Sequence, residues 1–126
     1  MFIRPRAQTR DLSGSAFGTI TNYTSDQTIA VSQNFETFTN LGAVGQITLT
    51  LPTPAAGLQY TFIVATAQNI ILDVGGSVVI AIGEGSPSSA GGSVACASPY
   101  SVLTLKAISA TLWVGIYQLG GAWTPS

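Results

Sequence analysis

The chain has 126 residues, a length that suits one domain and leaves no room for a second. Charged residues make up 7% of it, against about a quarter in typical soluble domains, and 46% of its residues are hydrophobic, so we expect much of its surface to lie in contacts with other molecules. Histidine is absent and the five carboxylates are scattered singly, which excludes a Ser-His-Asp triad and argues against acid–base catalysis and metal binding. We therefore expect no enzyme activity, no metal site and no cofactor.

Positive charge gathers at the start of the sequence. Arg4, Arg6 and Arg10 are three of the four basic residues, and with Asp11 they give the first 17 residues a net charge of +2, whereas the rest of the chain carries −3. The Ser-Gly-Ser run at residues 13–15 is typical of a flexible joint. We therefore interpret residues 1–18 as an extended basic N-terminal arm and residues 19–126 as the folded domain.

The arm has the composition of a docking segment. Its tip is apolar, and arginine side chains pair with carboxylates in a two-pronged geometry, so an acidic protein partner suits it better than nucleic acid, for which three charges supply little affinity. Fully extended, 18 residues reach roughly 60 Å, far enough to touch a neighbouring subunit. The alternative is a terminal segment without a role. The docking residues that we predict are Phe2, Ile3, Arg4, Arg6 and Arg10.

No export or membrane signal is evident in the pattern. Charge and proline interrupt residues 3–11, where a signal peptide would be apolar, and no apolar run is long enough to cross a membrane. Cys96 is the single cysteine, which excludes an internal disulfide, and its small apolar neighbours predict a buried thiol. We expect a protein made in a cytoplasm, with no membrane and no nucleic acid among its partners.

From residue 19 onward the sequence predicts an all-β domain. Short runs rich in β-branched and aromatic residues alternate with turn residues, and no stretch has the period of a helix. Ten short strands of this kind indicate a single β-sandwich or jelly-roll-like domain. The predicted strands are 19–24, 28–32, 36–40, 46–51, 59–66, 70–74, 77–82, 94–96, 102–108 and 112–117.

Two connections stand out among the turns. Gly75-Gly76 between apolar runs predicts a tight hairpin. Residues 83–92 are rich in glycine and serine and poor in hydrophobic residues, so we expect an exposed loop that could contact a partner. Candidate recognition residues there are Glu84, Ser86 and Ser88.

The two tryptophans differ in their surroundings. Trp113 lies in the apolar run Leu112-Trp113-Val114 and is predicted to be in the core. Trp123 follows Gly120-Gly121, and we predict that it is exposed and able to stack on a ligand such as a sugar.

Several stretches, taken in order, resemble a module that recurs in virion proteins of tailed bacteriophages. None of them is a catalytic signature, and the resemblance rests on their order and spacing over roughly residues 19–124. The stretches are Phe38-Thr39-Asn40-Leu41-Gly42-Ala43, Ile47-Thr48-Leu49-Thr50-Leu51-Pro52 with Gly57-Leu58-Gln59-Tyr60-Thr61-Phe62, and Val102-Leu103-Thr104-Leu105 with Trp113 and Gly121-Ala122-Trp123.

Such modules occur in head decoration (cement) proteins and in fibre or spike proteins. The resemblance implies a homotrimer that binds the major capsid protein on the outer capsid surface of the virion and stabilises the shell, and the lack of a long shaft favours this use. The alternative is a small tail fibre or baseplate module that binds a host receptor. A structural β-module unconnected with viruses also stays open.

Overall fold

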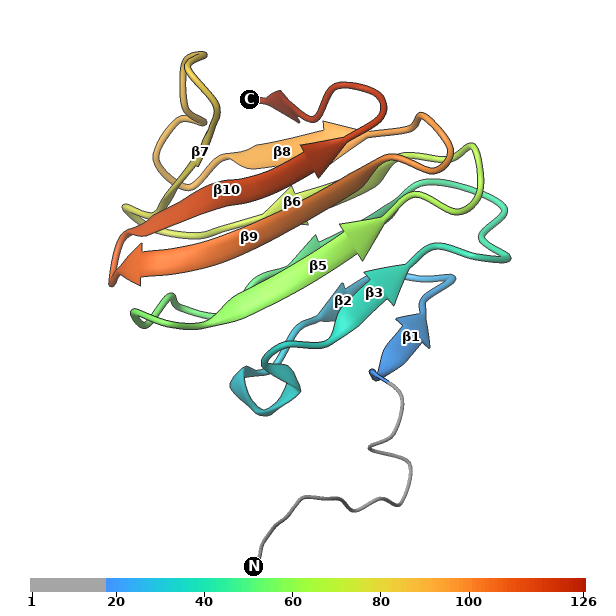
Figure 1. The fold of residues 1–126 in the computed structure, drawn as a ribbon, viewed down its shortest axis with the longest axis horizontal. Helices are drawn as coiled ribbons and strands as arrows, with labels where there is room; N and C mark the ends of the chain where they lie inside the picture. The colour runs from blue at the N-terminus through green and yellow to red at the C-terminus, as the bar shows by residue number, and fades with distance from the viewer. Residues whose placement is uncertain (1–17) are drawn as a thin grey trace, which may run out of the picture.

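A computed structural model describes residues 18–126 of the chain (Figure 1). In this part of the chain, two β-sheets face each other and no α-helix is present, which confirms the predicted all-β sandwich. The short 3-10 turn η2 (Val31–Gln33) is the single helical turn among the described residues. It occupies the end of a segment predicted to be a strand.

The six-stranded sheet and the five-stranded sheet contain all the strands of this region. In spatial order, the six-stranded sheet consists of β1 (Ile20–Asn22), β3 (Thr37–Thr39), β5 (Gln59–Ile63), β9 (Val102–Ser109), β10 (Leu112–Leu119) and β7 (Val79–Ile82). The five-stranded sheet consists of β11 (Thr124–Pro125), β8 (Ser93–Cys96), β6 (Ile70–Asp73), β4 (Ile47–Thr50) and β2 (Gln27–Thr28).

The first six strands form a parallel coil. The chain passes from one sheet to the other after every strand, so β1, β3 and β5 stack in parallel in one sheet and β2, β4 and β6 stack in parallel in the other. Thr37 lies opposite both Ile20 and Thr61, which shows how successive turns of the coil lie in register. We call this region, residues 20–73, the parallel coil.

The remaining strands close the sandwich mainly by antiparallel pairing. β9 lies between β5 and β10 and is antiparallel to both, and β8 is antiparallel to β6. Only β7 pairs in parallel, with β10. We call this region, residues 79–125, the antiparallel half.

The predicted hairpin at Gly75-Gly76 is wrong. β6 and β7 belong to different sheets, so these glycines lie in a connection that crosses the sandwich. The reason is that both sides of β6 are already occupied, by β4 and by β8, which leaves no edge for a hairpin partner.

The core follows the two-residue period of the strands. Ile47 and Leu49 of β4 point inward while Thr48 and Thr50 point outward, as the alternation predicts. An aromatic chain runs through the interior: Tyr23 stacks on Phe38, which contacts Phe62 and Tyr60, and Tyr60 contacts Trp113. The core positions predicted for Trp113 and Cys96 are confirmed, since both side chains are buried.

Candidate interaction surfaces

The predicted docking arm lies outside the described residues. Phe2, Ile3, Arg4, Arg6 and Arg10 all precede Gly18, so their contacts stay a prediction. The described surface must therefore supply the evidence for where a partner could bind.

Trp123 is not an exposed recognition residue. Its side chain is only 3% exposed, because β11 pairs with β8 immediately after it and turns the indole into the core. The preceding glycines allow this path: Gly120 has a φ of +85°, and the N–H of Gly121 donates to Ser101 Oγ at 2.7 Å. The sequence prediction overlooked that two residues are enough to form an edge strand.

The loop of residues 83–92 is only partly a display loop. Glu84 and Ser86 are exposed, as predicted. Ser88 is not, because it is 4% exposed and fastens the loop to β7: its N–H donates to the carbonyl of Ile80 at 2.8 Å, and its Oγ accepts from the Ile80 N–H at 2.9 Å. The predicted exposure of Ser88 is therefore wrong.

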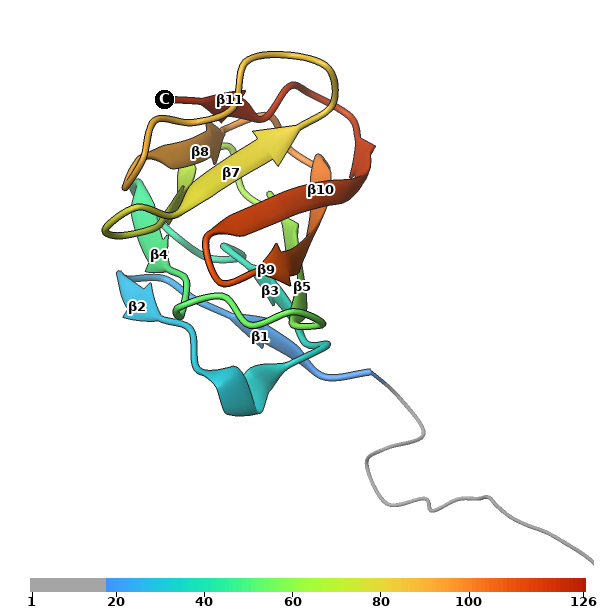
Figure 2. The same cartoon turned by 90° about the vertical axis from the view of Figure 1, so that its left-hand side faces the viewer.

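This attachment seals one end of the sandwich. The N–H of Gly91 also donates to the carbonyl of Val78, so the loop takes up backbone groups of β7 that face away from β10. Ser126, which follows β11, exchanges backbone hydrogen bonds with Ser93 and accepts one from Ser89. Figure 2 shows β7, β11 and the loop together at the upper end of the molecule. We call this region the sealed end.

The opposite end has no such cover among the described residues. Figure 2 shows β1, β2 and the 3-10 turn together at the lower end, where both sheets stop at a parallel strand. Thr19 and Tyr23 form backbone hydrogen bonds with β3, so by the alternation of a strand the backbone groups of Ile20 and Asn22 face the free edge. The backbone groups of Thr28 likewise face the outer edge of β2, because the neighbouring Ile29 N–H donates to the carbonyl of Thr50 on β4.

We call this region the open end, and its side chains are apolar and acidic. Ile20 and Phe35 are 63% and 68% exposed, and Val31 is 55% exposed. Phe35 also has a φ of +67°, a left-handed conformation that costs a bulky residue free energy and holds the ring outward. Asp26 precedes β2 and Glu36 precedes β3, so both carboxylates flank this end.

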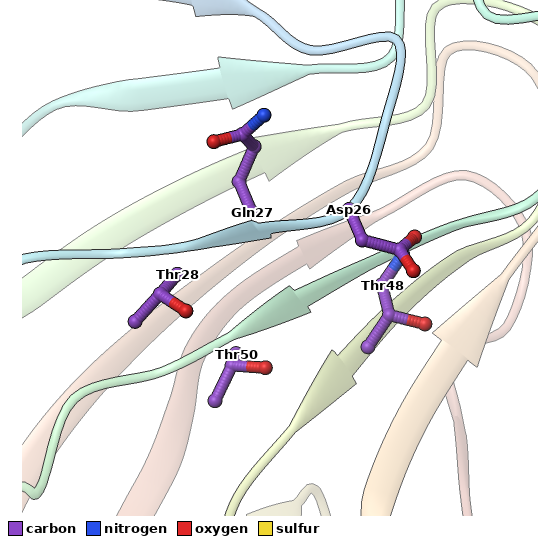
Figure 3. A pocket seen from close by; sticks show the side chains of 5 residues that line it. All are labelled: Asp26, Gln27, Thr28, Thr48 and Thr50. Atoms are coloured by element: carbon purple, nitrogen blue, oxygen red, sulfur yellow. The ribbon is translucent and has the colours of Figure 1, made fainter.

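A polar groove of about 500 Å³ lies on the outer side of β2 and β4 (Figure 3). Its walls carry one carboxylate, one amide and three hydroxyls, from Asp26, Gln27, Thr28, Thr48 and Thr50. Asp26 Oδ1 accepts the backbone N–H of Thr48 at 2.8 Å, so the carboxylate takes the place of a strand neighbour at the start of β4. The groove offers hydrogen-bonding groups but no aromatic platform.

The outer side of the six-stranded sheet is almost free of charge. Lys106 is the one charged residue in its strands, and the end of β10 exposes three large apolar side chains, Ile116, Tyr117 and Leu119, each to more than half. Thr61 and Thr104 hydrogen-bond to each other across β5 and β9 at 2.9 Å, so their hydroxyls already satisfy one another. This surface suits contact with another protein better than contact with a charged ligand.

The titratable groups show one clear perturbation. Burial, assisted by the negative charge of Glu36, raises the pKa of the Tyr60 hydroxyl above its usual value near 10. That hydroxyl donates to the carbonyl of Ala30 at 2.9 Å, so the neutral form has a structural role.

Residues 18–126 contain no cluster of three or more metal-ligating side chains, and none of their helical segments has the length and apolarity needed to span a membrane. The indole N–H groups of Trp113 and Trp123 are buried without a hydrogen-bond partner. Each costs stability but lies inside the core, where no ligand can reach it.

No protein family model matches the chain, and no curated protein matches its sequence.

Proposed function

We propose that this protein is a capsid decoration (cement) protein, which binds the outer surface of a phage head as a homotrimer and stabilises the shell. The ordered stretches between Phe38 and Trp123 that resemble tailed-phage virion modules support this proposal. The N-terminal arm, with its apolar tip and three arginines, would contribute contacts to the major capsid protein.

The observation that carries the proposal is a surface poor in charge and rich in exposed apolar side chains. Ten large hydrophobic residues of the described region are at least half exposed, while the strands of the six-stranded sheet hold Lys106 alone as a charge. A separate copy with this surface would be prone to aggregation, whereas assembly on a shell buries the same side chains. A protein that functions as part of a larger particle fits these properties.

A reconstitution experiment tests the proposal. Purified protein is added to phage heads that lack it, binding is measured by co-sedimentation, and shell strength by the temperature at which packaged DNA is released. We expect saturable binding and a higher release temperature. No binding to heads, at any concentration that keeps the protein soluble, would count against the decoration function.

The alternative function is a small tail fibre or baseplate module that binds a host receptor. The groove of Figure 3 favours this alternative, since hydroxyl, amide and carboxylate groups bind the hydroxyls of carbohydrates. Burial of Trp123 removes the aromatic platform that the sequence suggested, so the groove and the exposed Glu84 and Ser86 would have to provide recognition. Binding to host cells that is lost in Thr50→Val but kept in Thr124→Val would support this function; Thr124 is an exposed control on β11, with β8 and β6 between it and β4.

A further inference from the structure

The two ends of the sandwich differ in how their backbone edges are covered. At the sealed end, residues 83–92 and Ser126 take up the edge groups of β7 and β8. At the open end, Ile20, Asn22 and Thr28 direct backbone groups toward an edge that no residue of 18–126 covers. Free edges of this kind accept an added strand, and natural proteins usually cover them. For head-to-tail stacking of copies, the sealed end offers only the two-residue strand β11 as an edge, because the loop already occupies the edge of β7.

The chemistry of the open end defines the kind of segment that fits it. Asp26 and Glu36 are two of the four carboxylates in residues 18–126, whereas Lys106, the only basic residue there, lies on β9, with β3 and β5 between it and β1. Ile20 and Phe35 add exposed apolar surface. A matching segment is therefore extended, positively charged and partly apolar.

We propose that the open end binds the N-terminal segment, residues 1–17, of a neighbouring copy of this chain. That segment carries Arg4, Arg6 and Arg10 for the two carboxylates, and Phe2 and Ile3 for the exposed apolar side chains. Seventeen residues extend up to about 55 Å. The six-stranded sheet is roughly 25 to 30 Å wide across its strands, so the segment is long enough to cross to another copy.

Exchange between copies has a consequence for assembly. Each copy gives one segment and receives one, which is a head-to-tail contact that closes into a ring, such as a trimer, when the rotation between copies permits. This inference does not rest on the decoration function. It gives the arm a different partner from the capsid contact proposed above, because a segment bound to a neighbouring copy is not available to the major capsid protein.

Directed disulfide cross-linking in the full-length chain tests the exchange. In a Cys96→Ala background, protein with Arg10→Cys is mixed with protein carrying Ile20→Cys at the open end, and the mixture is oxidised and run on a non-reducing gel. The matched control replaces Ile20→Cys with Leu119→Cys, which is similarly exposed but lies on β10. We expect a covalent dimer from the first mixture, at least about tenfold more abundant than from the control, because proximity raises the effective concentration of the thiols.

Three results would overturn the proposal: equal cross-linking in both mixtures, no cross-linking in either, or a chain with both Arg10→Cys and Ile20→Cys that closes a disulfide only within itself. The last result would assign the segment to the open end of its own chain. Loss of capsid binding together with normal cross-linking would instead count against the decoration function alone.

Charge-neutral variants provide a second, independent readout. We expect Asp26→Asn with Glu36→Gln to weaken self-association, measured by sedimentation equilibrium, by about three- to tenfold at low salt, and the difference to fade as salt screens the charges. Asparagine keeps an acceptor for the Thr48 N–H, so the fold is preserved. The matched control, Asp73→Asn with Glu84→Gln, should associate normally; the same weakening in both pairs would contradict a role for the open end.

Discussion

The parallel coil and the antiparallel half are built from similar short strands but solve the problem of sheet edges differently. The antiparallel half finishes with its own cover, since the loop of residues 83–92 and the β11 segment fold back over β7 and β8. The coil begins at β1 and β2 with no cover among the described residues. Within residues 18–126, the chain therefore covers its own sheet edges at one end and leaves those of β1 and β2 uncovered at the other.

The largest expected effect comes from removing an anchor of the sealed end. Trp123→Ala should lower the free energy of unfolding by about 3 to 5 kcal/mol, because a buried indole leaves a large cavity. Urea denaturation measures the change. Trp123→Phe should cost less, since it fills much of the space and removes an unpaired buried N–H. A loss below about 1 kcal/mol for the alanine variant would show that the indole is exposed in solution.

The corresponding anchor of the parallel coil is Asn40. Its side chain is fully buried and forms four hydrogen bonds with the backbone of the next turn of the coil: Oδ1 accepts from Ala65 and Thr66, and Nδ2 donates to the carbonyls of Thr66 and Gln68. Asn40→Ala should lower the free energy of unfolding by about 2 to 4 kcal/mol, because it leaves several buried backbone groups without partners. Hydrogen exchange at residues 64–69 should rise before exchange in β9 does. Hydrogen exchange at residues 64–69 that stays the same in Asn40→Ala as in the unchanged protein would contradict this local role.

A smaller loss of stability is expected from Gly92→Ala, which should loosen the sealed end without creating a cavity in the core. A Cβ at Gly92 would overlap the backbone oxygen of Ser126 and come within 2.9 Å of the carbonyl oxygen of Ser89. Gly92→Ala should therefore cost about 1 to 3 kcal/mol and increase hydrogen exchange in β11. The matched control is Gly85→Ala in the same loop, where a Cβ meets open space and where we expect a change below about 0.5 kcal/mol. Similar exchange rates in the two variants would mean that the loop does not seal β11.

The smallest effect concerns alkaline pH and the Tyr60 hydroxyl. Its pKa is raised in the folded state, so above pH 10 the unfolded chain loses this proton first and ionisation favours unfolding. Stability should therefore fall as the pH rises above about 10, and Tyr60→Phe should make that fall less steep. At neutral pH the variant should be about 1 kcal/mol less stable, because the hydrogen bond to Ala30 is lost. Tyr100→Phe, at an exposed position, is the control, and an unchanged alkaline slope in Tyr60→Phe would contradict the assignment.

Local pattern was sufficient to predict the strands but not their partners. Each predicted strand segment overlaps an observed strand, because alternation such as Ile47-Thr48-Leu49-Thr50 directly encodes which side chains face the core. The segment 28–32 shares only Thr28 with β2, and β11 was not predicted. Parallel pairing within the coil depends on contacts between residues 17 to 24 positions apart, as between Ile20, Thr37 and Thr61, and no local signal specifies them. The hairpin predicted at Gly75-Gly76 was wrong for the same reason.

The candidate surfaces were predictable only in part. Composition indicated a protein that makes many contacts, and it identified Glu84 and Ser86 as exposed. Trp123 was misplaced because its burial depends on the two-residue strand β11, which pairs with β8, a strand far away along the sequence. Ser88 was misplaced because its burial depends on hydrogen bonds to Ile80 of β7. The open end was missed because the stacking of the coil decides that β1 and β2 are the outermost strands of their sheets, with Asp26 before β2 and Glu36 before β3, the neighbour of β1.

The most direct test of the central claim is the copy number of this protein in purified virions, measured by quantitative mass spectrometry against the major capsid protein. A decoration protein bound across the shell predicts hundreds of copies, because the shell repeats its binding site many times. A few to a few dozen copies would match the symmetry of a tail and contradict the decoration function in favour of receptor binding. Complete absence from the particle would contradict both.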